Sequence, residues 1–312
     1  MQSGLDRRKF LTAAAGLAAA WQLPFAAARA GQKSAGPLVL RLESLVDGIQ
    51  LVQGADTNVL VVPGADGTLM IDGGSPTQSG ALLRLVTSSA GPVRTLVNTH
   101  WHTDHTGCNE TLGKVGATLI AHENTRLWMQ RPIHVAWQEQ NYPAMPAKAL
   151  PTRTFYNHES VTLGNRNARL GALGQAHTDG DIYVHFPESN VLAVGDVVSV
   201  GNYPIVDWST GGWNRGMFDA TNTLLKLCDD QTRIVPGTGP VVGKAHLQKQ
   251  HDMLDVLTER VWQLMRKGMS DLDIVAAKPT ADYDAQWGDP RQFLLNTYAS
   301  VWNHVREMKG IV

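Results

Sequence analysis

The feature that most constrains this chain is a cluster of metal-ligating side chains at the end of a short apolar segment. That segment is typical of a buried strand, and it leads directly into residues 99–105, whose sequence is THWHTDH. Side chains alternate along an extended chain, so His100 and His102 are expected to point to the same side. Asp104 and His105 follow where the chain turns into a helix. The arrangement predicts a metal site at a strand end, with a surface histidine cluster as the alternative interpretation.

The amino-acid composition excludes several kinds of metal site and several classes of protein. Imidazole and carboxylate ligands together favour zinc, with manganese or iron as alternatives. The two cysteines cannot build a zinc site of four thiolates or a disulfide-rich scaffold. The 27 Lys and Arg residues nearly balance the 28 Asp and Glu residues, whereas nucleic-acid-binding proteins usually carry a basic excess. We therefore expect a small-molecule substrate, no nucleic-acid partner, and a chain long enough for a substantial core.

Strand-like and helical segments alternate along the chain, which predicts a mixed α/β fold. Apolar runs bounded by Gly, Asp and Pro predict strands at residues 38–46, 49–53, 58–63, 68–71, 93–98, 117–121, 160–163, 168–172, 182–186, 191–194 and 233–235. Helices are predicted at residues 79–88, 123–129 and 214–227, and helical periodicity runs from Lys244 onward. Residues 131–152 contain four prolines and no clear periodicity, so we expect a long functional loop there.

In this setting, the pattern HxHxDH in residues 100–105 resembles the signature of the metallo-β-lactamase superfamily. The resemblance covers roughly residues 38–243 and includes further matches at residues 71–74 (IDGG), 176–181 (AHTDGD) and 195–196 (GD). It implies an α/β (α+β) fold, a four-layer αββα sandwich with metals at one edge of two packed sheets. The helical segment after residue 243 is expected to form a C-terminal extension of this domain.

The resemblance also implies a set of metal ligands. The first metal would be held by His100, His102 and His177, and the second by Asp104, His105 and a bridging Asp196. Metal-bound hydroxide would then act as the nucleophile, and Asp104 is the candidate catalytic residue that orients the hydroxide or relays its proton. Asp72 either supports the metal site from behind the ligands or simply forms a turn before Gly73 and Gly74.

One position departs from the family pattern. The family usually completes its ligands with a histidine in a Pro-Gly-His-Gly turn, and this chain has Pro236-Gly237-Thr238-Gly239 instead. A neutral hydroxyl is a much poorer zinc ligand than imidazole. We therefore expect one or two zinc ions per chain, with a weak and exchangeable second site unless His246 folds back as a substitute.

Aromatic residues gather in two loop segments that could contact a substrate. Trp137 and Tyr142 lie in the proline-rich segment, and Trp208 and Trp213 lie shortly after Asp196. Aromatic loops over a metal site favour a partly apolar organic substrate. The alternative is that these rings pack the loops onto the sandwich.

The first thirty residues are typical of an export signal. Arg7, Arg8 and Lys9 precede an apolar run that is too short to span a membrane comfortably, and the run ends near an Ala-Arg-Ala site at residues 28–30. The order resembles a twin-arginine signal, which implies the twin-arginine export machinery as a partner. We predict a signal peptide over residues 1–30, cleavage after Ala30, and a periplasmic protein; an amphipathic first helix or a retained anchor is the alternative.

These observations divide the chain into the signal peptide, a metallo-β-lactamase-like domain over residues 31–243 and a helical extension over residues 244–312. An oxidising compartment permits a disulfide between Cys108 and Cys228, although their spacing does not indicate that they meet. Cys108 alone could also be a ligand or a redox-sensitive thiol, with packing favoured.

The predicted function is a zinc-dependent hydrolase that uses metal-bound hydroxide on a lactam, lactone, ester or thioester. One alternative is an oxidoreductase resembling the mononuclear-iron sulfur dioxygenases, with iron held by His100, His177 and Asp196. The other alternative is a non-catalytic periplasmic metal-binding accessory protein.

Overall fold

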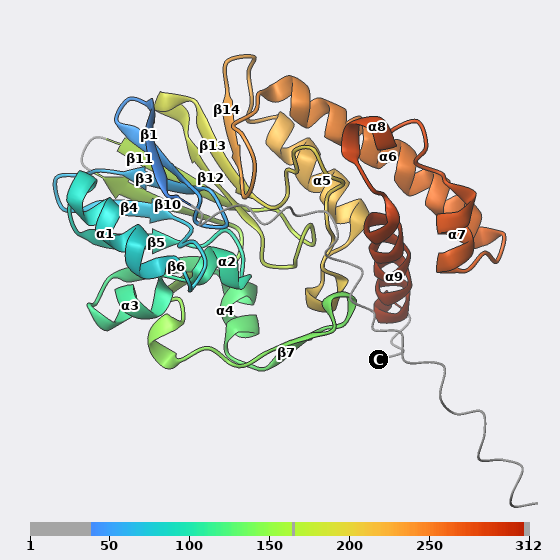
Figure 1. Ribbon diagram of the computed structural model, residues 1–312, viewed down its shortest axis with the longest axis horizontal. Helices are drawn as coiled ribbons and strands as arrows, with labels where there is room; N and C mark the ends of the chain where they lie inside the picture. The colour runs from blue at the N-terminus through green and yellow to red at the C-terminus, as the bar shows by residue number, and fades with distance from the viewer. Residues whose placement is uncertain (1–38, 164–165, 309–312) are drawn as a thin grey trace, which may run out of the picture. The chain divides into compact units, whose positions relative to one another are not determined.

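Two β-sheets packed face to face form the centre of the structure (Figure 1). The computed structural model describes residues 39–163 and 166–308, so the predicted signal peptide lies outside the described residues. The first sheet contains β1 (Arg41–Val46), β2 (Ile49–Gln53), β3 (Val59–Val62), β4 (Thr68–Ile71), β5 (Val93–Val97), β6 (Thr118–His122) and β9 (Arg153–Phe155), in that order. The second contains β10 (His158–Leu163), β11 (Arg166–Ala172), β12 (Ile182–Phe186), β13 (Val191–Gly195) and β14 (Arg233–Pro236).

Helices cover the outer faces of both sheets. The first sheet packs against α1 (Ser79–Ala90), α3 (Asn109–Lys114) and α4 (Glu123–Met129). The second packs against α5 (Asn214–Leu225) and α6 (Lys244–Arg266). The resulting order of helices, sheet, sheet and helices confirms the predicted αββα sandwich.

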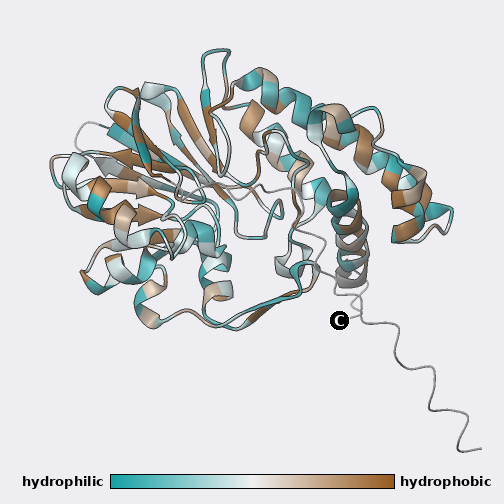
Figure 2. Ribbon diagram, viewed as in Figure 1, coloured by the Kyte–Doolittle hydropathy of each residue, from teal (hydrophilic) through white to brown (hydrophobic). Residues whose placement is uncertain are grey.

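The central strands of each sheet, such as β3, β4 and β13, read as continuous apolar runs because both of their faces are buried. In β3, Leu60 and Val62 point into the core between the sheets, whereas Val59 and Val61 point toward α1. In the second sheet, β13 alternates in the same way between the central core and the core beneath α5 and α6. The apolar colouring of the central strands in Figure 2 follows from this double burial.

Parallel pairs of strands bring the ends of four segments to one edge of the sandwich. β4 pairs in parallel with β5, with Ile71 opposite Val97. β13 pairs in parallel with β14, with Gly195 opposite Pro236. The carboxyl ends of each pair are therefore flush, and the residues that follow all four strands meet at that edge.

The C-terminal helices share one apolar core with the second sheet. This part of the chain comprises α6, α7 (Asp271–Ala277), α8 (Asp284–Trp287) and α9 (Arg291–Met308). Leu247, Leu257 and Phe293 of these helices join Leu192 and Val194 of β13 in a single buried cluster. The predicted helical extension is thus present, and its boundary with the preceding domain at residue 243 stays a prediction.

The prediction of a long loop over residues 131–152 was wrong in detail. The segment forms a small hairpin of β7 (Ile133–Val135) and β8 (Gln140–Tyr142), with the short 3₁₀ turns η1 (Ala136–Gln138) and η2 (Ala147–Ala149). Only three residues of each strand pair, too few to produce a recognisable alternation, and the prolines flank the strands rather than interrupt them.

The short helix α2 (Thr103–Thr106) begins where the chain was expected to turn into a helix. The helix α3 and the edge strand β9 escaped prediction, because they span only six and three residues. Two further 3₁₀ turns, η3 (Pro187–Ser189) and η4 (Trp208–Thr210), complete the described elements. Among the described helices, none combines the length and apolar composition needed to cross a membrane.

The shared core predicts that truncating one α6 side chain destabilises the whole sandwich. Leu257 is fully buried, and Leu257→Ala is expected to lower the free energy of unfolding by about 2–5 kcal/mol. The neighbouring Val256 is 37% exposed, so Val256→Ala serves as the control and is expected to change it by about 0.5 kcal/mol. Urea unfolding followed by circular dichroism measures the free energy of unfolding of both variants. Equal losses in Leu257→Ala and Val256→Ala would contradict the shared core.

Candidate metal centre

Two groups of side chains that could hold a metal ion lie at the common edge of the two sheets. The first comprises His100, His102, His177 and Asp196, and the second comprises Asp104, His105 and Asp196. Within each group the potential ligand atoms lie within 4.8 Å of one another. The structure therefore brings together all six residues for which a ligand role was predicted.

The first group converges through three imidazole nitrogens. His102 Nδ1 lies 3.0 Å from both His100 Nε2 and His177 Nε2. Asp196 Oδ2 lies 3.9 Å from the His100 nitrogen and 3.7 Å from the His177 nitrogen. Ligands about 2.0–2.1 Å from a tetrahedral zinc ion lie roughly 3.3 Å from one another. The donor set and its spacing therefore fit such an ion.

The backbone explains why these nitrogens meet. His102 is extended (φ −56°, ψ 147°) and immediately precedes α2, so the predicted change from extended chain to helix occurs at this residue. His100 and His102 consequently point to the same side. His177 arrives from the turn between β11 and β12.

Hydrogen bonds on the far side of the rings fix which nitrogen faces the centre. His177 Nδ1 donates to the Ile205 carbonyl (2.8 Å) and His102 Nε2 donates to Asp207 Oδ2 (3.0 Å). The opposite nitrogen of each ring is then left with a lone pair aimed inward. Such partners orient metal-binding histidines and raise their basicity.

The second group surrounds one imidazole with carboxylates. His105 Nε2 lies 3.4 Å from Asp196 Oδ1 and 3.7 Å from Asp104 Oδ2. His105 Nδ1 donates to Asp72 Oδ2 at 2.8 Å. Asp196 thus presents one oxygen to each group, the arrangement expected of a bridging ligand. The Asp104 side chain is 40% exposed, which leaves it open to solvent.

The two groups differ in their electrostatics. Burial, together with the charges of neighbouring histidines, holds the pKa of His100 well below its usual value. Burial acts in the same direction on His105, but the carboxylates of Asp72, Asp196 and Asp104 outweigh it and hold that pKa well above the usual value. The first group therefore offers a neutral ring, and the second favours a positive charge, whether a proton or a metal cation.

Asp72 supports the site from behind His105, which was one of its two predicted roles. It is 2% exposed and has a left-handed backbone (φ 63°). Its carboxylate also accepts hydrogen bonds from the Thr99 amide and hydroxyl, each at 2.8 Å. Asp72 therefore connects the end of β4 to both ends of the histidine motif.

Asp207 is a buried residue of the site that the sequence did not reveal. Its carboxylate accepts hydrogen bonds from His102 Nε2, from Trp137 Nε1 (3.1 Å) and from the Thr210 hydroxyl (2.7 Å). Burial acts to raise the pKa of Asp207, but the hydrogen bonds from His102 and Thr210 and the charges of His102 and His177 outweigh it and hold that pKa below its usual value. The only signal was its position between the aromatic residues after Asp196, and an Asp in such a loop is usually solvated.

The turn that carries Thr238 touches the bridging carboxylate through its glycine. A Cβ atom on Gly237 would lie 1.9 Å from Asp196 Oδ1, so only glycine fits there. The Thr57 hydroxyl and the Asn58 backbone N–H each donate to the Gly237 carbonyl at 2.6 Å. Thr238 itself is exposed. His246, the predicted substitute ligand, belongs to neither group. Its Nε2 lies 2.7 Å from the Ser199 carbonyl oxygen instead.

The four aromatic candidates for substrate contact occupy different surroundings. Trp137 is tied to Asp207, and Tyr142 packs edge-on against Trp101 with ring centroids 5.3 Å apart. Trp213 stacks on His304 of α9 at 3.7 Å. Two of the four are therefore joined to the histidine motif, and their role toward a substrate stays a prediction.

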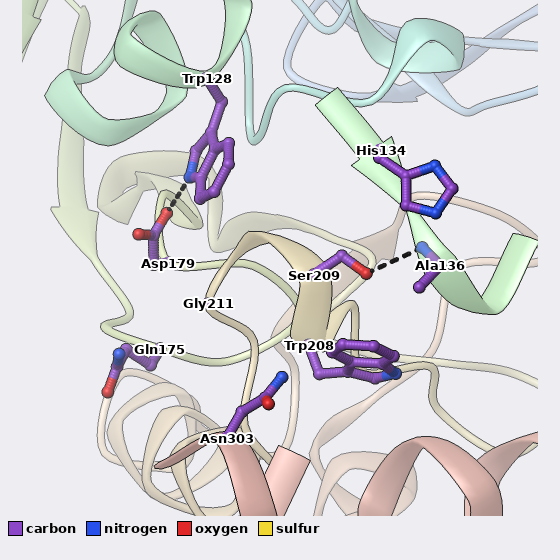
Figure 3. A pocket seen from close by; sticks show the side chains of 9 residues that line it. All are labelled: Trp128, His134, Ala136, Gln175, Asp179, Trp208, Ser209, Gly211 and Asn303. Atoms are coloured by element: carbon purple, nitrogen blue, oxygen red, sulfur yellow. Dashed lines mark hydrogen bonds between the residues drawn. The ribbon is translucent and has the colours of Figure 1, made fainter. Parts of the chain in front are cut away.

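Trp208 lines a cavity of about 370 Å³, shown in Figure 3. Trp128 faces the same space and donates through Nε1 to Asp179 Oδ1 at 2.6 Å. The Ala136 amide donates to the Ser209 hydroxyl across another wall. Of the described residues around this cavity, none belongs to either ligand group.

Both cysteines are buried and unpaired, so the permitted disulfide is not formed. Burial raises the pKa of the Cys108 thiol to about 12 and that of Cys228 to about 11. Cys108 belongs to neither ligand group. Packing is therefore the observed role of both side chains.

Comparison with protein families gives one decisive match. Residues 53–237 match the model of the metallo-β-lactamase superfamily, which spans more than half of the chain. The chain belongs to the metallo-β-lactamase superfamily. Membership in this superfamily supports a metal-dependent, hydrolase-like function in general terms, and the ligand groups described above are capable of binding the metal.

Solved structures share the fold of this superfamily member. A metallo-β-lactamase from Pontibacter korlensis superposes with a TM-score of 0.58 at 20% identity, covering 70% of this chain and 99% of that one. The DIM-1 metallo-β-lactamase gives a TM-score of 0.55 at 18% identity, covering 69% and 97%. At these identities the similarity establishes the fold alone.

One curated relative is the α subunit of 2,4-dinitroanisole O-demethylase from Nocardioides sp. (strain JS1661). It is 26% identical over 216 residues, which cover 67% of this chain. The match spans 60% of the length of that subunit.

The hydrogen bond from His102 predicts that Asp207 tunes the first metal site. Asp207→Asn keeps the size of the side chain but removes the charge, and is expected to weaken zinc binding at the first site by about 10–100-fold. Competition with a chromophoric chelator measures the affinity. Asp255→Asn, at a position whose side chain is 62% exposed on α6, is the control. Equal affinity in both variants would show that Asp207 only supports the loop.

Proposed function

We propose that this protein is a zinc-dependent hydrolase acting on a lactam, lactone, ester or thioester. The observation that carries the proposal is the convergence of His100 Nε2, His102 Nδ1 and His177 Nε2, with acceptors holding the far nitrogens of His102 and His177. Three imidazoles and one carboxylate form a donor set that zinc prefers.

When bound, the metal would lower the pKa of a coordinated water to about 7 and polarise a substrate carbonyl oxygen. The chain's own residues supply the remaining functions. Asp104 has a solvent-exposed carboxylate within 3.7 Å of His105 Nε2 and is suited to accept the proton of the attacking water. His102 and His177 hold their orientation through the bonds described above. Because the metal would supply the nucleophile from water, no nucleophilic Ser, Cys or Lys is required.

The second group supports a weaker site. It has three donors, Asp104, His105 and Asp196, and the turn that would supply another carries an exposed Thr238. We infer that the second zinc, where present, exchanges more readily than the first. A one-metal hydrolase and a two-metal hydrolase are both consistent with this set.

The Nocardioides relative adds one bond class to the proposed substrates. That protein is named for removing the methyl group of 2,4-dinitroanisole, an aryl ether activated by two nitro groups. Hydroxide displaces alkoxide from rings activated in this way, as it displaces leaving groups from activated acyl carbons. Activated aryl ethers therefore belong in the substrate panel beside lactams, lactones, esters and thioesters.

We also propose that the protein is exported through the twin-arginine machinery and acts in the periplasm. Arg7, Arg8 and the apolar run that follows support this, together with the Ala-Arg-Ala site ending at Ala30. N-terminal sequencing of exported protein is expected to begin at Gly31.

The experiment that tests the hydrolase proposal uses the mature chain purified without added metal. Its metal content is measured first, and hydrolysis of the panel is then followed in the native, chelated and zinc-restored protein. Chelation and His100→Ala are each expected to lower the rate at least about 10³-fold, because water without the metal keeps a pKa near 15.7. His158→Ala, at an exposed position, is the control.

Each outcome distinguishes the candidates. Hydrolysis that survives chelation and His100→Ala would refute the proposed mechanism. Iron in the native protein, with oxygen consumption on a persulfide, would favour the oxidoreductase alternative through His100, His177 and Asp196. Absence of any bound metal would favour a non-catalytic accessory protein.

A single substitution tests the second site. Thr238→His restores the usual family residue and is expected to tighten the second zinc by at least about tenfold, comparable to the effect of orienting groups in other metal sites. Calorimetric titration of zinc into the metal-free protein measures both sites. Thr223→His, on the exposed face of α5, is the control. Unchanged stoichiometry and affinity would show that the turn does not reach the second site.

A further inference from the structure

A small apolar cavity lies beside the histidine motif, and none of the proposed metal-ligating residues lines it. Its volume is about 140 Å³, and it lies between the motif and the β7–β8 hairpin. Trp101, Met129 and Ile133 form its floor, each 5% exposed or less. Thr103 and Tyr142 supply the only hydroxyl groups among the described residues that line it.

The cavity can be reached from solvent. Its rim consists of Pro143, Ala144 and Pro146, which are exposed, and of the half-buried Met145. The two prolines restrict the backbone of the rim. The Met145 amide donates to the Met129 carbonyl at 2.8 Å, which fixes the rim against the end of α4.

The cavity shares a wall with the metal centre. Trp101 and Thr103 flank His102 in the chain, and the Trp101 and His102 rings lie 4.4 Å apart. Tyr142 lies on the same side, where burial and the charges of Asp104 and Asp207 raise its pKa. A group held in the cavity would therefore lie against the segment of chain that carries His102.

Hydrogen bonds make the floor of the cavity continuous with a ligand. Trp101 Nε1 donates to the Thr210 hydroxyl at 3.1 Å, and that hydroxyl donates to Asp207 Oδ2. Asp207 in turn accepts from His102. The wall is thus ordered by the same carboxylate that orients His102, and it can position a group relative to the metal.

The size of the cavity decides what it can hold. Complete sites for small organic ligands usually measure about 300–1,000 Å³, so 140 Å³ accommodates one substituent and not a whole molecule. An apolar cavity of about 150 Å³ is known to bind benzene. The dimensions and the apolar lining match a phenyl ring or an alkyl group of similar volume.

We propose that this pocket, lined by Trp101, Met129, Ile133 and Met145, binds a phenyl-sized apolar substituent of the substrate. It thereby selects among acyl compounds at the neighbouring metal centre, and this role rests on the hydrolase function proposed above. The larger cavity at Trp208 is less suited to such a group, because Gln175, Asp179 and Asn303 line it with polar atoms.

The first test measures whether the protein prefers substrates that carry a phenyl group. The zinc protein is assayed with matched acetyl and phenylacetyl versions of each ester and thioester in the panel. The phenylacetyl compound is expected to have a kcat/KM at least about 100-fold higher. Ala144→Phe places a ring at the rim, in the space proposed for the substituent, and is expected to reduce the ratio of the two kcat/KM values below about 10-fold.

The second test measures binding without catalysis. Fluorobenzene is titrated into the metal-free and the zinc-bound protein and observed by ¹⁹F NMR. Exchange broadening of its signal is expected with the unmodified chain and is expected to disappear with Ala144→Phe. Ala147→Phe, an exposed position in the same segment outside the cavity, is the control that retains both selection and binding. Circular dichroism and zinc content establish that both variants fold.

The outcomes separate this proposal from the proposed function. Absence of hydrolysis of every compound, with fluorobenzene bound and lost in Ala144→Phe, would refute the hydrolase and leave an apolar binding pocket. Hydrolysis with equal rates for acetyl and phenylacetyl compounds would refute the pocket's role in selection. Absence of fluorobenzene binding, or equal binding by Ala144→Phe, would refute the pocket itself.

Discussion

The hydrogen bonds of the Asp72 carboxylate are the constraint on which the metal centre depends. Through them the end of β4 holds Thr99 at the start of the histidine motif and His105 at its end. The residue adopts a left-handed backbone (φ 63°), which costs a non-glycine residue on the order of 1–3 kcal/mol unless its surroundings compensate. Three hydrogen bonds to a buried carboxylate supply that compensation. They also hold both ends of residues 99–105, the segment that carries His100 and His102.

The negative charge of the Asp196 carboxylate is shared between the two ligand groups. Its two oxygens lie toward different histidines, and burial alone would raise its pKa, yet the surrounding imidazoles hold that pKa well below its usual value. The close approach of Gly237 then limits how far the carboxylate can move. A metal cation in either ligand group would therefore meet an Asp196 carboxylate that already carries its negative charge and already presents an oxygen to that group.

The sequence predicted what depends on local periodicity and on the family motif. It missed a contact between distant residues that no motif marks, and strands too short to show a period. Alternation along an extended chain correctly put His100 and His102 on one side, and buried runs such as β3 were predicted because both their faces are apolar. His177 is 75 residues from His102 and was found only through the resemblance. Asp207 is 105 residues from the same ring, in a loop without a recognisable motif, and was missed. The β7–β8 hairpin was missed because its strands are too short to show a period.

The two buried cysteines have a consequence for where this chain can fold. Each remains an unpaired thiol, and burial keeps the reactive thiolate scarce at neutral pH. Oxidants and disulfide exchange act on the thiolate, so neither sulfur is readily attacked once the core has formed. The fold accordingly needs no disulfide isomerase and gains nothing from a reducing partner. Both sulfurs therefore keep the same chemical state under reducing and under oxidising conditions as long as the core around them stays closed.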